Sequence, residues 1–187
     1  MSNSLRDKVV VVTGASSGIG RSIALESASR GATVILMARH QDKLEEIANE
    51  ARQLSGNEVY VFPTDISKAD QIDRAFNEIV SHVDHIDYLV NAAGFGVFKE
   101  FLETSPQVMT EMFQTNVLGL MYFTRLVARV MIDQKQGQII NFGSIAGIVP
   151  TTKTAAYSAN KAAIIQFSNV LRLELIPFGV KVMTVNP

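Results

Sequence analysis

The segment Val9–Gly20, with the sequence VVVVTGASSGIG, constrains the fold of this chain more than any other. Its run of valines is β-branched and apolar on both faces, which is typical of a strand buried inside a parallel sheet. Gly14, Gly18 and Gly20 follow, before a helical pattern that ends near Arg30. Glycines allow a sharp turn and a close approach of backbone to phosphate, while the helix N-terminus offers free N–H groups. The segment predicts a phosphate-binding turn between strand and helix, although an ordinary turn can use the same glycines.

Apolar runs typical of buried strands alternate with amphipathic helical patterns along the rest of the chain. This alternation predicts a parallel sheet covered on both faces, because parallel strands need crossover connections. With right-handed crossovers the result is an α/β, doubly wound, Rossmann-like fold, in a single dinucleotide-binding domain over residues 1–187. Ser67 and Asp70 resemble a capping box that opens the third helix. Strands are expected at 8–13, 33–38, 58–63, 86–91, 138–142 and 180–185, and helices at 18–30, 41–54, 67–83, 106–135 (with a break) and 156–176.

The composition excludes several classes of function. A formal net charge of −1 gives no long-range attraction to nucleic acid or to anionic lipid. The chain has no cysteine, and His40, His82 and His85 show no metal-binding spacing with acidic residues. The first residues lack the layout of a signal peptide, and no apolar run approaches the ~18–20 residues that a bilayer span needs. We therefore expect a cytoplasmic protein that needs no metal, nucleic acid or membrane.

Tyr157 and Lys161 stand one helical turn apart, so both side chains lie on one face of the last predicted helix. An ordinary tyrosine has a pKa near 10 and is a poor base at neutral pH. A neighbouring ammonium group stabilises the phenolate, so this spacing favours a tyrosine that acts as general acid and base. Ser144 follows a predicted strand and is a candidate hydrogen-bond donor to a reacting oxygen. Taken alone, a tyrosine four residues before a lysine is usually a pair on a helix surface, and a serine after a strand is usually a helix cap. Together with the glycine-rich turn, they favour hydride transfer between a dinucleotide and a carbonyl or alcohol.

These motifs, in this order, resemble those of the short-chain dehydrogenase/reductase family, in its shorter branch. The resemblance covers nearly the whole chain and rests on Thr13–Gly20 (TGxxxGxG), Asp65, Asn91–Gly94 (NAAG), Asn116, Ser144, Tyr157–Lys161 (YxxxK) and the final Asn186-Pro187. It implies a Rossmann-like fold and an NAD(P)-dependent oxidoreductase that acts on CH–OH groups.

The resemblance also implies individual roles. Tyr157 would exchange the proton, Ser144 would hydrogen-bond the reacting oxygen, and Lys161 would also hold the nicotinamide ribose. Asn116 would support a water chain that returns protons to Lys161, and Asp65 would accept from the adenine amino group. The expected catalytic residues are Asn116, Ser144, Tyr157 and Lys161. The expected cofactor-binding residues are Gly14, Ser16, Ser17, Gly18, Ile19, Gly20, Arg39, Asp65, Ile66, Asn91, Ala92, Tyr157, Lys161 and Pro187.

The end of the second predicted strand bears on the choice of dinucleotide. NAD-specific sites usually carry an acid there, about 20 residues beyond the glycines. Here Ala38 takes that position and Arg39 follows. A guanidinium pairs with a phosphate through two hydrogen bonds, so we expect NADP rather than NAD. His40 is a further candidate for contact with the 2′-phosphate. The alternative is that Arg39 is only exposed to solvent at the end of the strand, without a ligand.

Two loops that follow strand ends are mostly apolar, and in the resembling family both border the substrate. They contain Phe95, Val97 and Phe98 in the first, and Ile145, Ile148, Val149 and Pro150 in the second. We expect a hydrophobic or aromatic ketone, aldehyde or alcohol as substrate, unless these residues pack a loop against the sheet or against another subunit instead. The helical segments 109–135 and 156–176 are apolar on more than one face, which favours a homodimer or homotetramer. Burial within one subunit is the alternative.

The chain ends at Pro187, whereas members of the resembling family continue with a substrate lid and a seventh strand. We therefore expect a member that is incomplete at its C-terminus, with the sixth strand at an exposed edge. Two other functions stay open on the sequence. One is a non-catalytic dinucleotide-binding protein or inactive fragment, and the other is a 3-ketoacyl thioester reductase.

Overall fold

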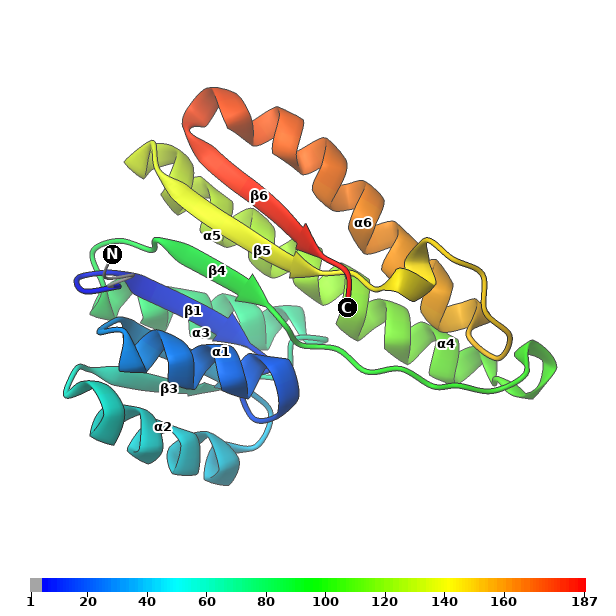
Figure 1. The fold of residues 1–187 in the computed structure, drawn as a ribbon, viewed down its shortest axis with the longest axis horizontal. Coiled ribbons are helices and arrows are strands. Elements are labelled where there is room, and N and C mark those ends of the chain that lie inside the picture. Colours follow the sequence, from blue (N-terminus) through cyan, green and yellow to red (C-terminus); the bar gives the residue numbers. More distant parts are fainter. Residues whose placement is uncertain (1–4) are drawn as a thin grey trace.

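The computed structural model describes residues 5–187, in which six parallel strands form one sheet with helices on both faces (Figure 1). The strand order is β3-β2-β1-β4-β5-β6, so β6 lies at an edge as expected. The chain reverses its winding direction between β1 and β4, and such a switch opens a crevice at the carboxyl ends of the strands. The strands are β1 (Val9–Thr13), β2 (Thr33–Ala38), β3 (Val59–Pro63), β4 (Tyr88–Asn91), β5 (Gly137–Phe142) and β6 (Val180–Val185).

The helices match the predicted segments within a few residues, except where the structure divides the long predicted helix 106–135. They are α1 (Gly18–Ser29), α2 (Gln41–Ser55), α3 (Ala69–His82), α4 (Pro106–Phe113), α5 (Leu120–Gln134) and α6 (Ala155–Leu175). A π-helical turn, Gln114–Gly119, joins α4 to α5. At Gly119 a Cβ atom would overlap the carbonyl oxygen of Ile66, so only glycine lets the turn pack against the loop after β3. Among residues 5–187, no helix is both long and apolar enough to cross a bilayer.

The valines of β1 explain the two layers of helices. Val9 and Val11 pack into a core with α3 and α5, whereas Val10 and Val12 pack into a second core with α1 and α2. All are 5% exposed or less. Successive side chains of a strand point to opposite faces, so a continuous apolar run is what a sheet covered on both sides requires.

The capping box expected at the start of α3 was wrong. The helix begins at Ala69, and its N-cap residue Lys68 makes no side-chain hydrogen bond to it. Ser67 instead donates its hydroxyl and its backbone N–H to Asp65 Oδ1, at 2.7 and 2.9 Å. A charged acceptor two residues upstream binds this hydroxyl, so it is not free to cap the helix.

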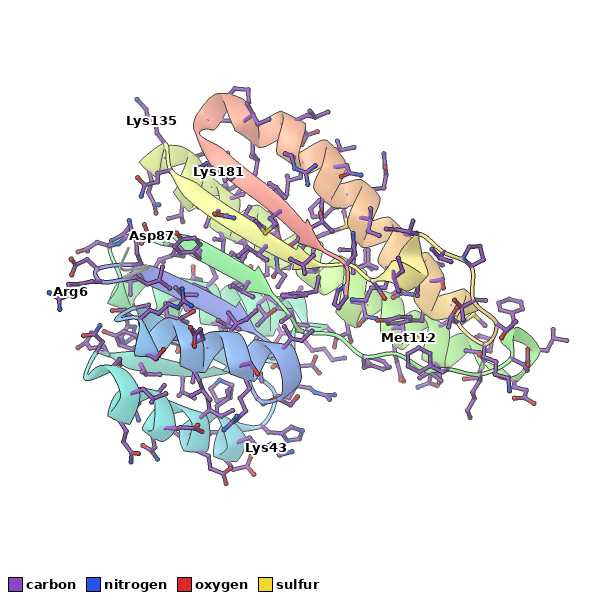
Figure 2. All side chains as sticks on the ribbon, in the orientation of Figure 1. Arg6, Lys43, Asp87, Met112, Lys135 and Lys181 are labelled. Atoms are coloured by element: carbon purple, nitrogen blue, oxygen red, sulfur yellow. The ribbon has the colours of Figure 1, made fainter. Side chains whose placement is uncertain are left out.

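A buried carboxylate, Asp87, fixes the end of the sheet opposite the crevice, where the strands begin (Figure 2). Its Oδ1 accepts from Lys8 Nζ at 2.9 Å and from Gln136 Nε2 at 3.1 Å. Its Oδ2 accepts from the backbone N–H of Val9 at 2.9 Å. The hydrogen bond and the charge of Asp87 raise the pKa of Lys8 above its ordinary value. Charge-assisted bonds therefore tie β1 to the segments that begin β4 and β5.

A buried polar chain runs beneath the crevice. Asn91 Nδ2 donates to Thr124 Oγ1 on α5 and to Asn141 Oδ1 on β5, both at 2.9 Å. Asn141 Nδ2 then donates to Ser168 Oγ on α6 at 2.9 Å. Such bonds fix relative positions because breaking one leaves a buried polar group without a partner. The chain thereby fixes α6 relative to β4 and β5.

Candidate active site

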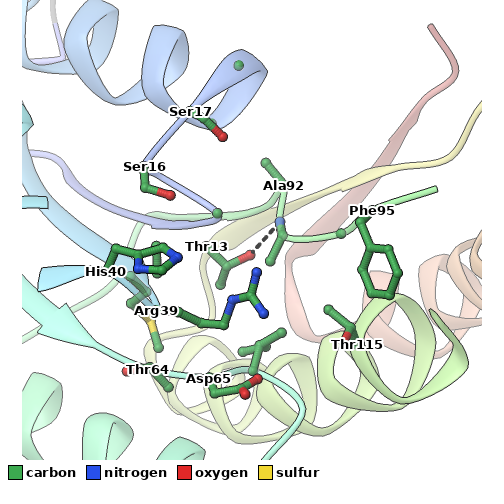
Figure 3. A pocket seen from close by; sticks show the side chains of 18 of the residues that line it. Thr13, Ser16, Ser17, Arg39, His40, Thr64, Asp65, Ala92, Phe95 and Thr115 are labelled. Atoms are coloured by element: carbon green, nitrogen blue, oxygen red, sulfur yellow. Dashed lines mark hydrogen bonds between the residues drawn. The ribbon is translucent and has the colours of Figure 1, made fainter. Parts of the chain in front are cut away.

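A cavity of about 320 Å³ opens at the carboxyl ends of β1, β2 and β4, where the strand order reverses (Figure 3). It is lined by Thr13, Gly14, Ser16, Ser17, Gly18, Ile19, Gly20, Met37, Ala38, Arg39, His40, Thr64, Asp65, Ile66, Ala92, Ala93, Gly94, Phe95 and Thr115. Its walls combine apolar side chains, such as Met37, Ile66 and Phe95, with backbone, hydroxyl groups and a few charged side chains. Apolar walls with a few polar groups are typical of preformed small-molecule sites.

The glycine-rich turn packs directly on the segment after β4. Gly14 has φ +68, and a Cβ atom there would lie 2.7 Å from the backbone of Ala93. A Cβ on Gly20 would overlap the carbonyl of Gly14, whereas one on Gly18 would meet nothing within 4 Å. The side chain of the N-cap residue Ser17 makes no hydrogen bond to α1. The N–H groups of the first helical turn are therefore available to an anion, and the turn fits a dinucleotide pyrophosphate.

Arg39 and Asp65 enter the cavity from the ends of two neighbouring strands. The Arg39 side chain extends across the cavity close to Asp65 (Figure 3). Burial alone would raise the pKa of the Asp65 carboxyl, and the two hydrogen bonds from Ser67 oppose it. The charges of Arg39 and Lys68 act in the same direction, so the pKa of Asp65 lies below its usual value. The cavity thus holds a cation and a carboxylate that stays ionised near neutral pH.

Tyr157 and Lys161 occupy the first turns of α6, beside the end of β5. Lys161 Nζ lies 5.7 Å from the centre of the Tyr157 ring and donates to the carbonyl oxygen of Phe142 at 2.7 Å. Burial lowers the pKa of Lys161 from 10.5 to about 8. The ammonium group thus lies beside the Tyr157 ring, on one face of α6 as the spacing predicts, and it still carries its charge at pH 7.

Ser144 lies just beyond β5 and is 8% exposed. Its hydroxyl accepts from the N–H of Ala146 at 3.2 Å and donates to the carbonyl oxygen of Pro187 at 3.4 Å. The second bond is long, so a closer acceptor can displace it. The Pro187 carbonyl also accepts from the N–H of Ile145 at 3.1 Å, which joins the end of the chain to this turn.

Asn116 lies buried in the π-helical turn and clamps the loop after β4. Its Oδ1 accepts from the N–H of Phe95 at 3.0 Å, and its Nδ2 donates to the carbonyl of Phe95 at 2.8 Å. Phe95 lines the cavity, and the backbone of the next residue, Gly96, lies against the Tyr157 ring. The clamp therefore links the cavity wall to the tyrosine.

The structure brings most of the expected cofactor residues to one cavity but not all of them. Those that line it are Gly14, Ser16, Ser17, Gly18, Ile19, Gly20, Arg39, Asp65, Ile66 and Ala92. Asn91 belongs to the buried polar chain, and Tyr157, Lys161 and Pro187 are not among the residues that line the cavity. Within the described residues, no cluster of histidine, aspartate and glutamate could hold a metal ion.

Three threonines of the cavity wall were not among the expected site residues: Thr13, which begins the quoted glycine-rich motif, Thr64 and Thr115. Thr13 Oγ1 accepts from the N–H of Ala93 at 3.2 Å, so it joins the glycine turn to the end of β4. A hydroxyl at the last position of an otherwise apolar strand is the signal that could have identified Thr13. Thr115 had a weaker signal, since it only precedes Asn116.

Comparison with known proteins agrees with this geometry. A family model described as short chain dehydrogenase matches residues 8–187. An uncharacterized oxidoreductase of Staphylococcus aureus is 35% identical over 183 residues, which are 98% of this chain and 78% of that protein.

Two solved structures show which ligands similar chains carry. A metagenomic short-chain oxidoreductase in complex with NADP is 34% identical, with a TM-score of 0.93, over 99% of this chain and 83% of that one. A 7α-hydroxysteroid dehydrogenase complexed with NADH and 7-oxo glycochenodeoxycholic acid is 26% identical, with a TM-score of 0.94, over 100% of this chain and 72% of that one. The chain spans only 65% of a short-chain dehydrogenase from Streptomyces avermitilis, to which it is 33% identical over 96% of its own length with a TM-score of 0.90. By its motifs, its fold and the family match over nearly all its residues, this chain belongs to the short-chain dehydrogenase/reductase family of oxidoreductases.

Proposed function

We propose that this chain is an NADP-dependent oxidoreductase that transfers a hydride between nicotinamide and a carbonyl or alcohol substrate. The observation that carries the proposal is the placement of Lys161 Nζ 5.7 Å from the Tyr157 ring, next to a cavity suited to a dinucleotide. The proposed chemistry is proton exchange between Tyr157 and the substrate oxygen, beside an ammonium group that the Phe142 carbonyl holds in place.

When bound, the nicotinamide cofactor supplies or accepts the hydride. In reduction, the Tyr157 hydroxyl donates its proton to the substrate oxygen, and in oxidation the phenolate removes it. Lys161 lies beside the Tyr157 ring and is itself held by the Phe142 carbonyl. Ser144 orients the substrate oxygen through its hydroxyl, which exchanges its long bond to Pro187 for a shorter one. Asn116 holds the loop that lies against the tyrosine.

The preference for NADP rests on Arg39. Its guanidinium lies in the cavity at the end of β2, and Ala38 takes the strand-end position where NAD-specific sites usually carry an acid. His40 lines the same wall. Because similar chains carry either NADP or NADH, the choice is tested directly by comparing the affinities of NADPH and NADH. Arg39→Ala should lose most of the NADPH affinity and leave that for NADH nearly unchanged.

The substrate is proposed to be apolar. Phe95, Phe98, Ile145, Ile148 and Val149 are between 41% and 60% exposed, and they belong to the two loops that border Tyr157 and Lys161. Exposed apolar side chains gathered around a reactive group are typical of a binding surface.

A homodimer through α5 and α6 is proposed as well. Part of the apolar surface noted in the sequence is buried between these helices, since Val117, Leu120 and Ile164 form a common cluster. Leu118 and Met121 stay exposed. A groove of about 220 Å³ between the helices is lined by Met121, Thr124, Arg125, Ala128, Arg129, Ile132, Phe167 and Leu171. Light scattering should give a dimer mass that Met121→Glu reduces to a monomer; a monomeric wild type would refute the assignment.

The activity is tested by following nicotinamide absorbance with NADPH and a panel of carbonyl compounds. Tyr157→Phe should abolish turnover and leave NADPH binding intact, because the ring and its contacts remain. Normal turnover by this variant would remove the assigned acid. Tight NADPH binding without turnover of any compound would instead favour a non-catalytic dinucleotide-binding protein.

A further inference from the structure

An exposed aromatic ring lies against Tyr157. The centre of the Phe98 ring is 5.2 Å from that of Tyr157, and their planes are inclined by 59°. Aromatic pairs prefer such tilted arrangements at this separation. Phe98 is nevertheless 60% exposed, so much of its ring surface is free beside the phenol. The mechanism proposed above does not use this ring.

The backbone at Gly96 supports the Phe98 ring. A Cβ atom on Gly96 would lie 2.9 Å from Tyr157 Cδ2 and 3.0 Å from Phe98 Cζ, so both rings rest on the backbone at this glycine. That backbone follows Phe95, whose N–H and carbonyl are both bound by Asn116. The ring is therefore part of a clamped loop and offers a preformed surface.

A second, aliphatic surface packs against α6 at Lys161, one helical turn after Tyr157. Ile145, Ile148 and Val149 are 50% to 58% exposed. Their turn packs tightly on α6, because a Cβ on Gly147 would lie 2.8 Å from the backbone of Lys161. The loop that follows this turn meets the loop that follows Phe98 through the pair Glu100–Lys153, at 3.9 Å (Figure 1). One aromatic and one aliphatic wall thus flank the Tyr157–Lys161 turn.

We propose that Phe98 is a specificity residue that selects carbonyl compounds with an aryl group attached to the carbonyl carbon. The inference rests on the proposed function, since the carbonyl oxygen must reach Tyr157. In the reaction the carbonyl carbon gains the hydride from the reduced cofactor, and the oxygen gains the Tyr157 proton. An aryl group beside that oxygen stacks on the free surface of Phe98. A saturated ring of similar size buries a similar area but lacks the ring–ring attraction, which favours the aryl compound by roughly threefold to tenfold.

The turnover test compares acetophenone with cyclohexyl methyl ketone in the presence of NADPH. Conjugation lowers the intrinsic reactivity of acetophenone, so the informative quantity is the change in the kcat/KM ratio of acetophenone to cyclohexyl methyl ketone. Phe98→Leu keeps an apolar side chain without a ring, so this ratio should fall about threefold to tenfold below that of the wild type. Phe178→Leu is the matched control: Phe178 is also about half exposed, at 46%, but lies past the other end of α6. This control should keep the wild-type ratio, and both variants should bind NADPH as the wild type does.

A binding test separates this inference from the proposed activity. Ligand-observed NMR with NADP⁺ present reports whether acetophenone binds more tightly than cyclohexyl methyl ketone, without any turnover. Acetophenone binding that Phe98→Leu weakens and Phe178→Leu does not would support the inference, even if the wild type reduced no compound and the proposed activity failed. Equal ratios in the wild type and Phe98→Leu, or no binding preference in the wild type, would overturn it.

Discussion

Replacing Lys161 with methionine should make the folded chain less sensitive to pH while abolishing the proposed activity. Burial lowers the pKa of Lys161 from 10.5 to about 8. At about 1.4 kcal/mol for each pH unit, this difference means that the buried ammonium group costs about 3 kcal/mol of folding free energy. Methionine has a similar length and carries no charge, so it avoids that cost. It also removes the hydrogen bond to the Phe142 carbonyl, and a charge-assisted bond contributes about 1.5–3 kcal/mol.

These two contributions nearly cancel at pH 7, so the pH dependence is the informative measurement. The folded-state pKa lies below the unfolded one, so the cost is fully present below pH 8 and disappears as the pH rises towards 10.5. Between pH 7 and pH 9.5 the wild type should therefore gain about 2 kcal/mol in unfolding free energy relative to Lys161→Met.

Urea unfolding of both proteins at a series of pH values, without cofactor, measures this difference. Lys43→Met is the matched control, because Lys43 is exposed on α2 and its change should leave the pH dependence unaltered (Figure 2). A constant difference between the wild type and Lys161→Met across this range would refute the assignment of a depressed pKa to Lys161. Retained turnover in Lys161→Met would refute its catalytic role separately.

Three further substitutions probe the cavity, the clamp and the opposite end of the sheet. Gly14→Ala should reduce NADPH affinity at least tenfold in a fluorescence titration, because the new Cβ would lie 2.7 Å from the Ala93 backbone and would strain a φ of +68. Asn116→Ala should lower kcat more than it raises the Kd for NADPH, because it releases Phe95 and the loop against Tyr157; an unchanged kcat would contradict the clamp. Asp87→Ala should cost about 2–3 kcal/mol in urea unfolding, and kcat of the folded enzyme should stay unchanged because Asp87 lies at the far end of the sheet.

The parts of the fold that follow from local pattern were predictable. The valine run of β1 predicts a strand covered on both faces, and both cores confirm it. Ser105 followed by Pro106 predicts the start of α4, and Ser105 Oγ accepts from the N–H of Val108 at 3.3 Å. Each of these signals is contained in a few consecutive residues.

Contacts between distant segments set the features that the sequence left open. A break in the segment 106–135 was expected, but its position depends on the fit of Gly119 against the Ile66 carbonyl. The expected capping box failed because Asp65 binds Ser67. The Tyr157–Lys161 spacing predicts that the two face one spot, whereas the packing of Phe98 on Tyr157 depends on how the loop after β4 folds back. No local pattern contains that information.

The two ends of the strands differ in how many buried polar groups have hydrogen-bond partners. At the amino ends, the Asp87 carboxylate accepts hydrogen bonds from Lys8, Val9 and Gln136. At the carboxyl ends, Lys161 is buried at a cost, and within the described residues Asn91 Oδ1, Asn160 Oδ1 and Thr184 Oγ1 are buried without a protein partner. Unfavourable features persist where function requires them and the rest of the fold supplies enough stability. Substitutions at Lys161 should therefore alter activity with little change in stability at pH 7, whereas changes around Asp87 should alter stability alone.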